Sequence, residues 1–315
     1  MSRASRVEIV EVGPRDGLQN ERRTLSVDSR FNFIQHLVAS GLRRIEVGAF
    51  VSPKWVPQMT GSRELIQRLY QNKRTMIKVA KQVRFSALVP NVKGMMDAME
   101  TPIEEVAVFG ACTESFSKKN INCSIGESLE RFREVIRLAR AHKRRVRGYL
   151  SVAFGCPYEG AVPEKKVVEL VEAYLKLGVY EISIGDTIGV ATPRQVQSLL
   201  KKLSGRAPVK RLALHLHDTR GTALANVLAG LQSGVRVFDS SFGGLGGCPY
   251  AQGASGNLST EDLVYMLHGM KVETNVDLEI LLKYESIMQT EMGHKLSSRT
   301  GLAGLPYGDV GQRRN

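Results

Sequence analysis

The feature of this sequence that most constrains its fold is a strand-like run followed by a helix-like run, repeated eight times. In the helix-like run 27–39, for example, Phe31, Ile34 and Leu37 recur at the spacing of one helix face. Strands that alternate with helices build a parallel sheet, and eight such units predict a closed (β/α)8 TIM barrel of the α/β class. The predicted strands are residues 7–12, 44–47, 85–89, 105–109, 146–153, 180–184, 211–217 and 235–239.

The length fits one such barrel with a helical addition. A barrel of this kind takes about 250 residues, and the chain has 315. We predict a single domain over 1–315, with the barrel at about 6–270 and a C-terminal helical extension at about 271–315. The extension includes a predicted helix over 277–292, and no linker indicates a second fold.

Composition excludes several classes of protein. Hydrophobic residues make up 43% of the chain and charged residues 24%, as in a soluble globular protein. No apolar run approaches the roughly 18 residues that a membrane span needs, and the first residues have no apolar export signal. The cysteines (Cys112, Cys123, Cys156 and Cys248) lack zinc-finger spacing and are interpreted as reduced thiols of a cytoplasmic protein.

The chain is basic, with 44 Lys and Arg against 31 Asp and Glu and a formal net charge of +13. Nucleic acid, an anionic small molecule or simple solvation of the surface could each account for this charge. The basic runs fall at predicted helix ends and loops, without interleaved aromatic residues. We therefore expect no nucleic-acid partner.

Polar residues follow several predicted strands, at the end where barrels of this class keep their chemistry. Strand 211–217 ends in His215 and His217, which point to one face because alternate strand residues do. Such a pair can bind a divalent cation, although an isolated His-x-His is also found as ordinary core histidines. Other strand ends supply Arg15, Asp16, Glu46, Asp186 and Thr187, and the glycine-rich loop after the eighth strand carries Cys248 and runs to Asn257.

Four of these residues form a mixed nitrogen and oxygen ligand set. Asp16, His215, His217 and Asn257 offer no thiolate, so they suit Mg²⁺ or Mn²⁺ better than structural zinc. Arg15 beside them would be a fixed cation for an oxyanion. Cys248 is either a mobile acid or base in flexible backbone or a small buried hydrophobe.

At these residues the chain resembles the 3-hydroxy-3-methylglutaryl-CoA lyase family. The resemblance covers almost the whole chain, and the matching segments are long and ungapped. They are residues 12–21 (VGPRDGLQNE), 50–59 (FVSPKWVPQM), 118–124 (KKNINCS), 155–160 (GCPYEG), 185–190 (GDTIGV) and the cysteine-bearing loop 244–257.

The resemblance implies cleavage of 3-hydroxy-3-methylglutaryl-CoA to acetyl-CoA and acetoacetate. A divalent cation on Asp16, His215, His217 and Asn257 would chelate the substrate hydroxyl and carboxylate. The hydroxyl proton would be taken by Asp16 or by a histidine of the metal site, for which His215 is the candidate. Arg15 would stabilise the enolate that Cys248 protonates, with Glu46 and Asp186 in supporting roles. The resemblance also implies Gln19, Asn120 and Thr187 as cofactor-binding candidates, an acyl-CoA partner and a homodimer.

Alternatives remain at this point. After Glu46 the chain has Val47-Gly48-Ala49-Phe50, where the family is expected to carry hydroxyl-bearing residues, so a longer 3-hydroxy-3-alkylglutaryl-CoA is one alternative substrate. A Claisen-type synthase, such as an isopropylmalate or homocitrate synthase, shares Arg-Asp-Gly and His-x-His words, but it usually has a charged loop in place of Cys248. A basic RNA-binding scaffold without catalysis is the third alternative. The basic connector 72–84 is interpreted as an insertion.

Overall fold

In the computed structural model, the strands pair in parallel and in chain order and close into a barrel. The structure describes residues 6–72, 83–246 and 256–306. The first and last strands close the sheet, with Glu8 opposite Val237 and Glu11 opposite Ser240. This confirms the predicted (β/α)8 fold. The strands are β1 (Glu8–Glu11), β2 (Arg44–Ala49), β3 (Arg84–Leu88), β4 (Glu105–Ala111), β5 (Arg145–Ser151), β6 (Glu181–Asp186), β7 (Leu212–Leu216) and β8 (Val237–Ser240).

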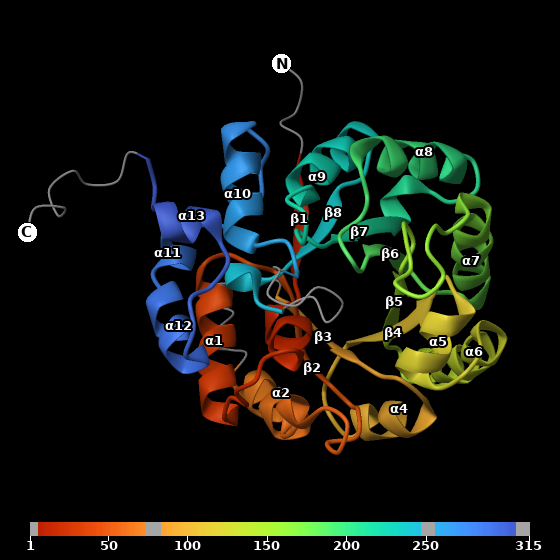
Figure 1. Ribbon diagram of the computed structural model, residues 1–315. Helices are drawn as coiled ribbons and strands as arrows, with labels where there is room; N and C mark the ends of the chain where they lie inside the picture. Colours follow the sequence, from red (N-terminus) through yellow and green to blue (C-terminus); the bar gives the residue numbers. More distant parts are fainter. Residues whose placement is uncertain (1–5, 73–82, 247–255, 307–315) are drawn as a thin grey trace, which may run out of the picture.

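Helices form a ring outside the barrel (Figure 1). The main apolar core lies between these helices and the outer face of the sheet, where residues such as Phe33, Phe132 and Leu199 are buried. The ring consists of α1 (Val27–Ala39), α2 (Ser62–Gln71), α4 (Val92–Met99), α5 (Glu114–Ile121), α6 (Ile125–Ala141), α7 (Glu164–Leu177), α8 (Pro193–Leu203), α9 (Ala223–Gln232) and α10 (Thr260–Gly269).

Local sequence signals fix several helix ends. Ser124 and Glu127 form a reciprocal capping box at the start of α6, which satisfies two backbone N–H groups that have no partner within the helix. Thr192 caps α8 in the same way, and Pro193 occupies its first turn. The predicted helix 27–39 matches α1 residue for residue, with Ser26 as its N-cap.

Two helix predictions need correction. The prediction omitted α5, which follows β4 and buries only Phe116 and Ser117, too few residues to give an apolar period. The predicted helix 277–292 is broken at Lys283 and Tyr284 into α11 (Leu278–Leu282) and α12 (Glu285–Met292), and α13 (Arg299–Ala303) follows. Of these helices, α11 packs against α1 and α10, and α13 packs against α10 (Figure 1). The single-domain division of the chain stays a prediction.

The interior of the barrel is unusually polar. A small apolar cluster of Val10, Val12, Ala213 and Val237 is joined there by buried charged side chains. Arg44, Arg147, Glu181 and Asp239 lie on four different strands and are linked by ion pairs. Removing one partner of such a buried pair typically costs about 3–5 kcal/mol, so this layer constrains how the strands meet. Within the described ranges, no helix is both long enough and apolar enough to span a membrane.

Candidate active site

A single turn of π-helix over Gly13–Gly17 places two candidate residues at the end of β1. The backbone N–H groups of Arg15, Asp16 and Gly17 all point to the Val12 carbonyl, at 3.1, 2.7 and 3.2 Å. Gly17 permits the close packing of this turn, because a Cβ there would lie 2.8 Å from Ser241 Oγ. Such turns are rare and occur often at functional sites.

Arg15 is a buried cation held by two carboxylates. Its Nε donates to Glu46 Oε2 at 2.5 Å, and its Nη1 donates to Asp16 Oδ1 at 2.5 Å. Burial alone would lower the pKa of Arg15, but the charges of Glu46 and Asp16 outweigh it and raise that pKa. The guanidinium therefore stays charged, and Nη2 has no acceptor among the described residues. Glu46 Oε1 is buried there as well, with no hydrogen-bond partner in the part of the chain that the structure describes.

Asp16 connects Arg15 to the two histidines and to Asn257. Its Oδ2 accepts from Asn257 Nδ2 at 3.0 Å and lies 3.9 Å from His215 Nε2. Burial would raise the pKa of Asp16, but the neighbouring charges of Arg15 and His215 lower it to about 2. An ionised carboxylate thus faces the histidine pair at neutral pH.

The two imidazoles leave one face of the barrel rim, as predicted. Their ring centroids are 5.3 Å apart, and β7 ends at Leu216 so that His217 pairs with Asn257 across an isolated bridge. Burial and the adjacent His215 lower the pKa of His217 to about 3, which keeps its ring neutral. Asp16, His215 and His217 each offer one ligand atom, and these atoms lie within 4.8 Å of one another.

Two buried polar atoms of this cluster have no partner among the described residues. They are His217 Nδ1 and Asn257 Oδ1. The Asn257 amide is oriented by its Nδ2, which donates to Asp16 Oδ2 and to the Leu245 carbonyl at 3.1 Å, so Oδ1 is left free. Orphaned buried acceptors are costly unless something satisfies them. One carboxylate, two imidazoles and an amide oxygen therefore fit a divalent cation such as Mg²⁺ or Mn²⁺.

The glycine-rich loop approaches this cluster closely. Gly246 has φ +98°, and a Cβ on it would lie 2.8 Å from Asn257 Nδ2 and 3.2 Å from Gly17. Only glycine combines that backbone conformation with such close contact. Cys248 itself lies outside the described residues, as does nearly all of the basic connector 72–84.

Of the other predicted residues, Asp186 and Thr187 make contacts that hold loops. Asp186 accepts from the backbone N–H groups of Val190 and Ala191 at 2.9 and 3.0 Å, and Thr187 Oγ1 accepts from the backbone N–H of Val152. Gln19 is half-buried after the π-helical turn, and Asn120 is exposed on α5. In the described part of the chain, neither Gln19 nor Asn120 has a hydrogen bond to the candidate metal ligands.

Sequence reasoning missed two residues that touch His215. The rings of Tyr149 on β5 and His215 are nearly perpendicular, with centroids 6.2 Å apart, and the Arg15 guanidinium lies 5.5 Å from the Tyr149 ring centroid. Asp239 on β8 lies 3.3 Å from His215 Nδ1. A signal for Asp239 was available, since it is an acidic residue at the end of a predicted strand.

The chain is similar to known proteins over nearly its whole length. The HMGL-like family model matches residues 6–288. A relative from Pseudomonas mevalonii named hydroxymethylglutaryl-CoA lyase is 50% identical over 297 residues, which cover 94% of this chain and 96% of the relative. A relative from Pseudomonas aeruginosa named 3-hydroxy-3-isohexenylglutaryl-CoA/hydroxy-methylglutaryl-CoA lyase is 46% identical, over 96% of this chain and 98% of its own. The structure of an HMG-CoA lyase from Acinetobacter baumannii in complex with coenzyme A and 3-methylmalate is similar with a TM-score of 0.89 at 36% identity, over 96% and 97% of the two chains.

Proposed function

This chain belongs to the HMGL-like family, and from that premise we propose that it cleaves 3-hydroxy-3-methylglutaryl-CoA to acetyl-CoA and acetoacetate. The observation that carries the proposal is the meeting of Asp16, His215, His217 and Asn257 at one point of the barrel rim, next to the Arg15 guanidinium. These positions are up to 241 residues apart in the chain.

The four residues would hold a divalent cation, which supplies Lewis-acid chemistry for the substrate's hydroxyl and carboxylate oxygens. Asp16 or His215 would accept the hydroxyl proton, because both lie at this point and Asp16 is ionised. When the C2–C3 bond breaks, charge develops on the thioester enolate, and the buried Arg15 cation would stabilise it. Glu46 holds Arg15 in place through its 2.5 Å ion pair. Cys248 would return a proton to the enolate carbon.

The named relatives do not favour the synthase alternative. Both curated relatives are lyases, and neither is named a synthase. The name of the Pseudomonas aeruginosa relative includes a longer-chain substrate in addition to the methyl-bearing one. Gly48, where a hydroxyl-bearing residue was expected, faces the outer helices, because a Cβ there would lie 2.7 Å from Ser62 Oγ and 3.3 Å from Arg30 Nη2. A side chain at position 48 would therefore point away from the barrel interior.

Purified protein incubated with Mg²⁺ and 3-hydroxy-3-methylglutaryl-CoA tests the proposal. We expect acetyl-CoA and acetoacetate in equal amounts, and we expect a chelator to stop their release. His217→Gln should abolish most of the activity. His268→Gln on α10 is the matched control, since its ring bonds Thr274 outside the site. An intact thioester, or cleavage that persists through thorough chelation, would contradict the proposal. Longer 3-hydroxy-3-alkylglutaryl-CoA thioesters in the same assay report chain-length preference.

An acyl-CoA partner follows from the proposed activity, and the Acinetobacter baumannii structure with coenzyme A supports it. The homodimer, the cytoplasmic location and the absence of a nucleic-acid partner stay predictions. So do the roles of Asp186, Gln19, Asn120 and Thr187.

A further inference from the structure

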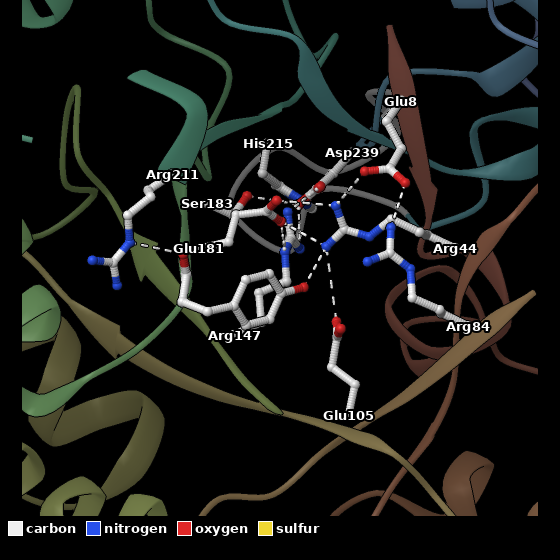
Figure 2. A network of polar contacts seen from close by, with 11 residues as sticks. Glu8, Arg44, Arg84, Glu105, Arg147, Glu181, Ser183, Arg211, His215 and Asp239 are labelled. Atoms are coloured by element: carbon white, nitrogen blue, oxygen red, sulfur yellow. Dashed lines mark hydrogen bonds and ion pairs between the residues drawn. The ribbon is translucent and has the colours of Figure 1, made fainter. Parts of the chain in front are cut away.

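A chain of buried ion pairs crosses the interior of the barrel and ends at one of the candidate metal ligands (Figure 2). Arg147 Nη2 donates to Asp239 Oδ1 at 2.7 Å, and Arg147 Nε donates to Glu181 Oε1 at 2.7 Å. Arg44 Nη2 donates to the same Glu181 oxygen at 2.7 Å, and Arg44 Nη1 lies 3.1 Å from Glu8 Oε2. Charges alternate along this chain, so Arg44, Glu181 and Arg147 each have a counterion on both sides.

Asp239 is the member of the chain that contacts His215. The two residues are paired in the β7–β8 register, and Asp239 Oδ2 lies 3.3 Å from His215 Nδ1. Asp239 Oδ2 also accepts from Ser183 Oγ at 2.7 Å and from Arg147 Nη1 at 3.2 Å. Because its side chain is fully buried and accepts hydrogen bonds from Arg147 and Ser183, the Asp239 carboxylate is held in one orientation.

The other nitrogen of His215 faces the candidate cation site. Its Nε2 lies 3.9 Å from Asp16 Oδ2. A hydrogen bond from Nδ1–H to Asp239 selects the tautomer in which Nε2 carries a lone pair and fixes the direction of that lone pair. Carboxylates behind metal-bound histidines commonly act in this way, and their loss typically weakens metal binding by about 10–100-fold.

We propose that Asp239 is a positioning residue for His215, and that Arg147 holds Asp239 in place for this task. The inference rests on the proposed cation site, and it names no new ligand. Asp239 and Arg147 act through His215 and do not contact the cation. The buried ions in the middle of the barrel thus have a function at its rim in addition to joining the strands.

The test measures Mn²⁺ binding to the folded protein by electron paramagnetic resonance, without substrate. Asp239→Asn keeps the shape of the side chain but removes its charge, and we expect the Kd for Mn²⁺ to rise by about 10–100-fold. Glu105→Gln is the matched control. It is the same change from acid to amide in the same network, but Glu105 lies at the opposite end from His215, 3.8 Å from Arg44 Nη2 (Figure 2). We expect its Kd to equal that of the parent.

A second measurement does not require the Asp239→Asn variant to fold. We expect nitrogen-15 NMR of the metal-free parent at pH 9 to show His215 with a protonated Nδ1 and an unprotonated Nε2. The His215 signals are assigned by their loss when His215 is substituted. An Nε2–H tautomer, or an unchanged Kd in folded Asp239→Asn, would overturn the inference. A protein that binds Mn²⁺ as expected but leaves 3-hydroxy-3-methylglutaryl-CoA intact would overturn the proposed function and leave this inference standing.

Discussion

Asn257 Nδ2 donates to Asp16 Oδ2 at 3.0 Å, joining the end of the first strand to the loop after the eighth. This bond orients the Asn257 amide so that Oδ1 faces no donor among the described residues. The closure of the barrel brings the two residues together, because β1 pairs with β8. The arrangement of the candidate site therefore depends on the fold being closed.

Arg15→Met should lower kcat with little effect on substrate affinity. If the guanidinium stabilises charge that develops in the transition state, its loss should cost about 3–4 kcal/mol, or about 10²–10³-fold in kcat. Steady-state kinetics on 3-hydroxy-3-methylglutaryl-CoA measures both parameters. A loss confined to KM would mean that Arg15 only binds substrate.

Cys248→Ala should keep metal and substrate binding but lose most turnover, because the thiol is the proposed proton donor to the enolate carbon. Single-turnover kinetics together with Mn²⁺ binding separates these effects. Cys123→Ala is a suitable control, since Cys123 is a free cysteine to which the proposed mechanism gives no role. Unchanged kcat in Cys248→Ala would remove the thiol from the mechanism.

Gly243→Ala should destabilise the protein by about 2–4 kcal/mol. Gly243 has φ +60°, and a Cβ on it would lie 2.4 Å from the buried Leu296 side chain, so backbone strain and overpacking add together. Urea unfolding measures the loss. Gly126→Ala on α6 is the control, because a Cβ there meets nothing within 4 Å and alanine favours a helix. Equal urea midpoints of unfolding for Gly243→Ala and the parent would show that position 243 does not require glycine.

Glu285→Gln should make the protein more stable at pH 8 and leave its stability unchanged at pH 4. Burial, with a smaller contribution from Asp262, raises the pKa of Glu285 from 4.5 to about 6, and its Oε1 has no partner among the described residues. The unfolded chain therefore ionises first, and the stability of the parent falls as pH rises from about 4.5 to 6. The difference at pH 8 is at most about 2 kcal/mol. If the unfolding free energies of Glu285→Gln and the parent differed by the same amount at every pH from 4 to 8, the raised pKa of Glu285 would be contradicted.

Much of the fold could be predicted because local signals and global architecture agree. The helix 27–39 has both a Ser26 cap and a clear apolar period, and it forms as predicted. The proximity of Asp16, His215 and His217 could be predicted, because a closed parallel barrel places the carboxyl ends of all its strands on one rim. No single motif would have sufficed, since each residue has a common structural role of its own.

The buried ions could not be predicted from local pattern. Arg44, Arg147 and Glu181 lie within strand-like runs, where a charged residue usually marks a face in contact with solvent. Only closure of the sheet turns that face inward and pairs the charges. The contact between Asp239 and His215 likewise depends on the β7–β8 register, which sequence periodicity does not fix.

The most direct test of the account is the number of Mn²⁺ ions that the chelator-treated protein binds, measured by electron paramagnetic resonance. The account predicts one saturable site per chain, and it predicts that Asn257→Ala and His217→Ala each weaken that site by at least about tenfold. It also predicts that the amount of bound metal follows the recovery of cleavage activity. The proposed cation site would be contradicted if the parent showed no saturable Mn²⁺ site, or if Asn257→Ala and His217→Ala both bound Mn²⁺ as tightly as the parent.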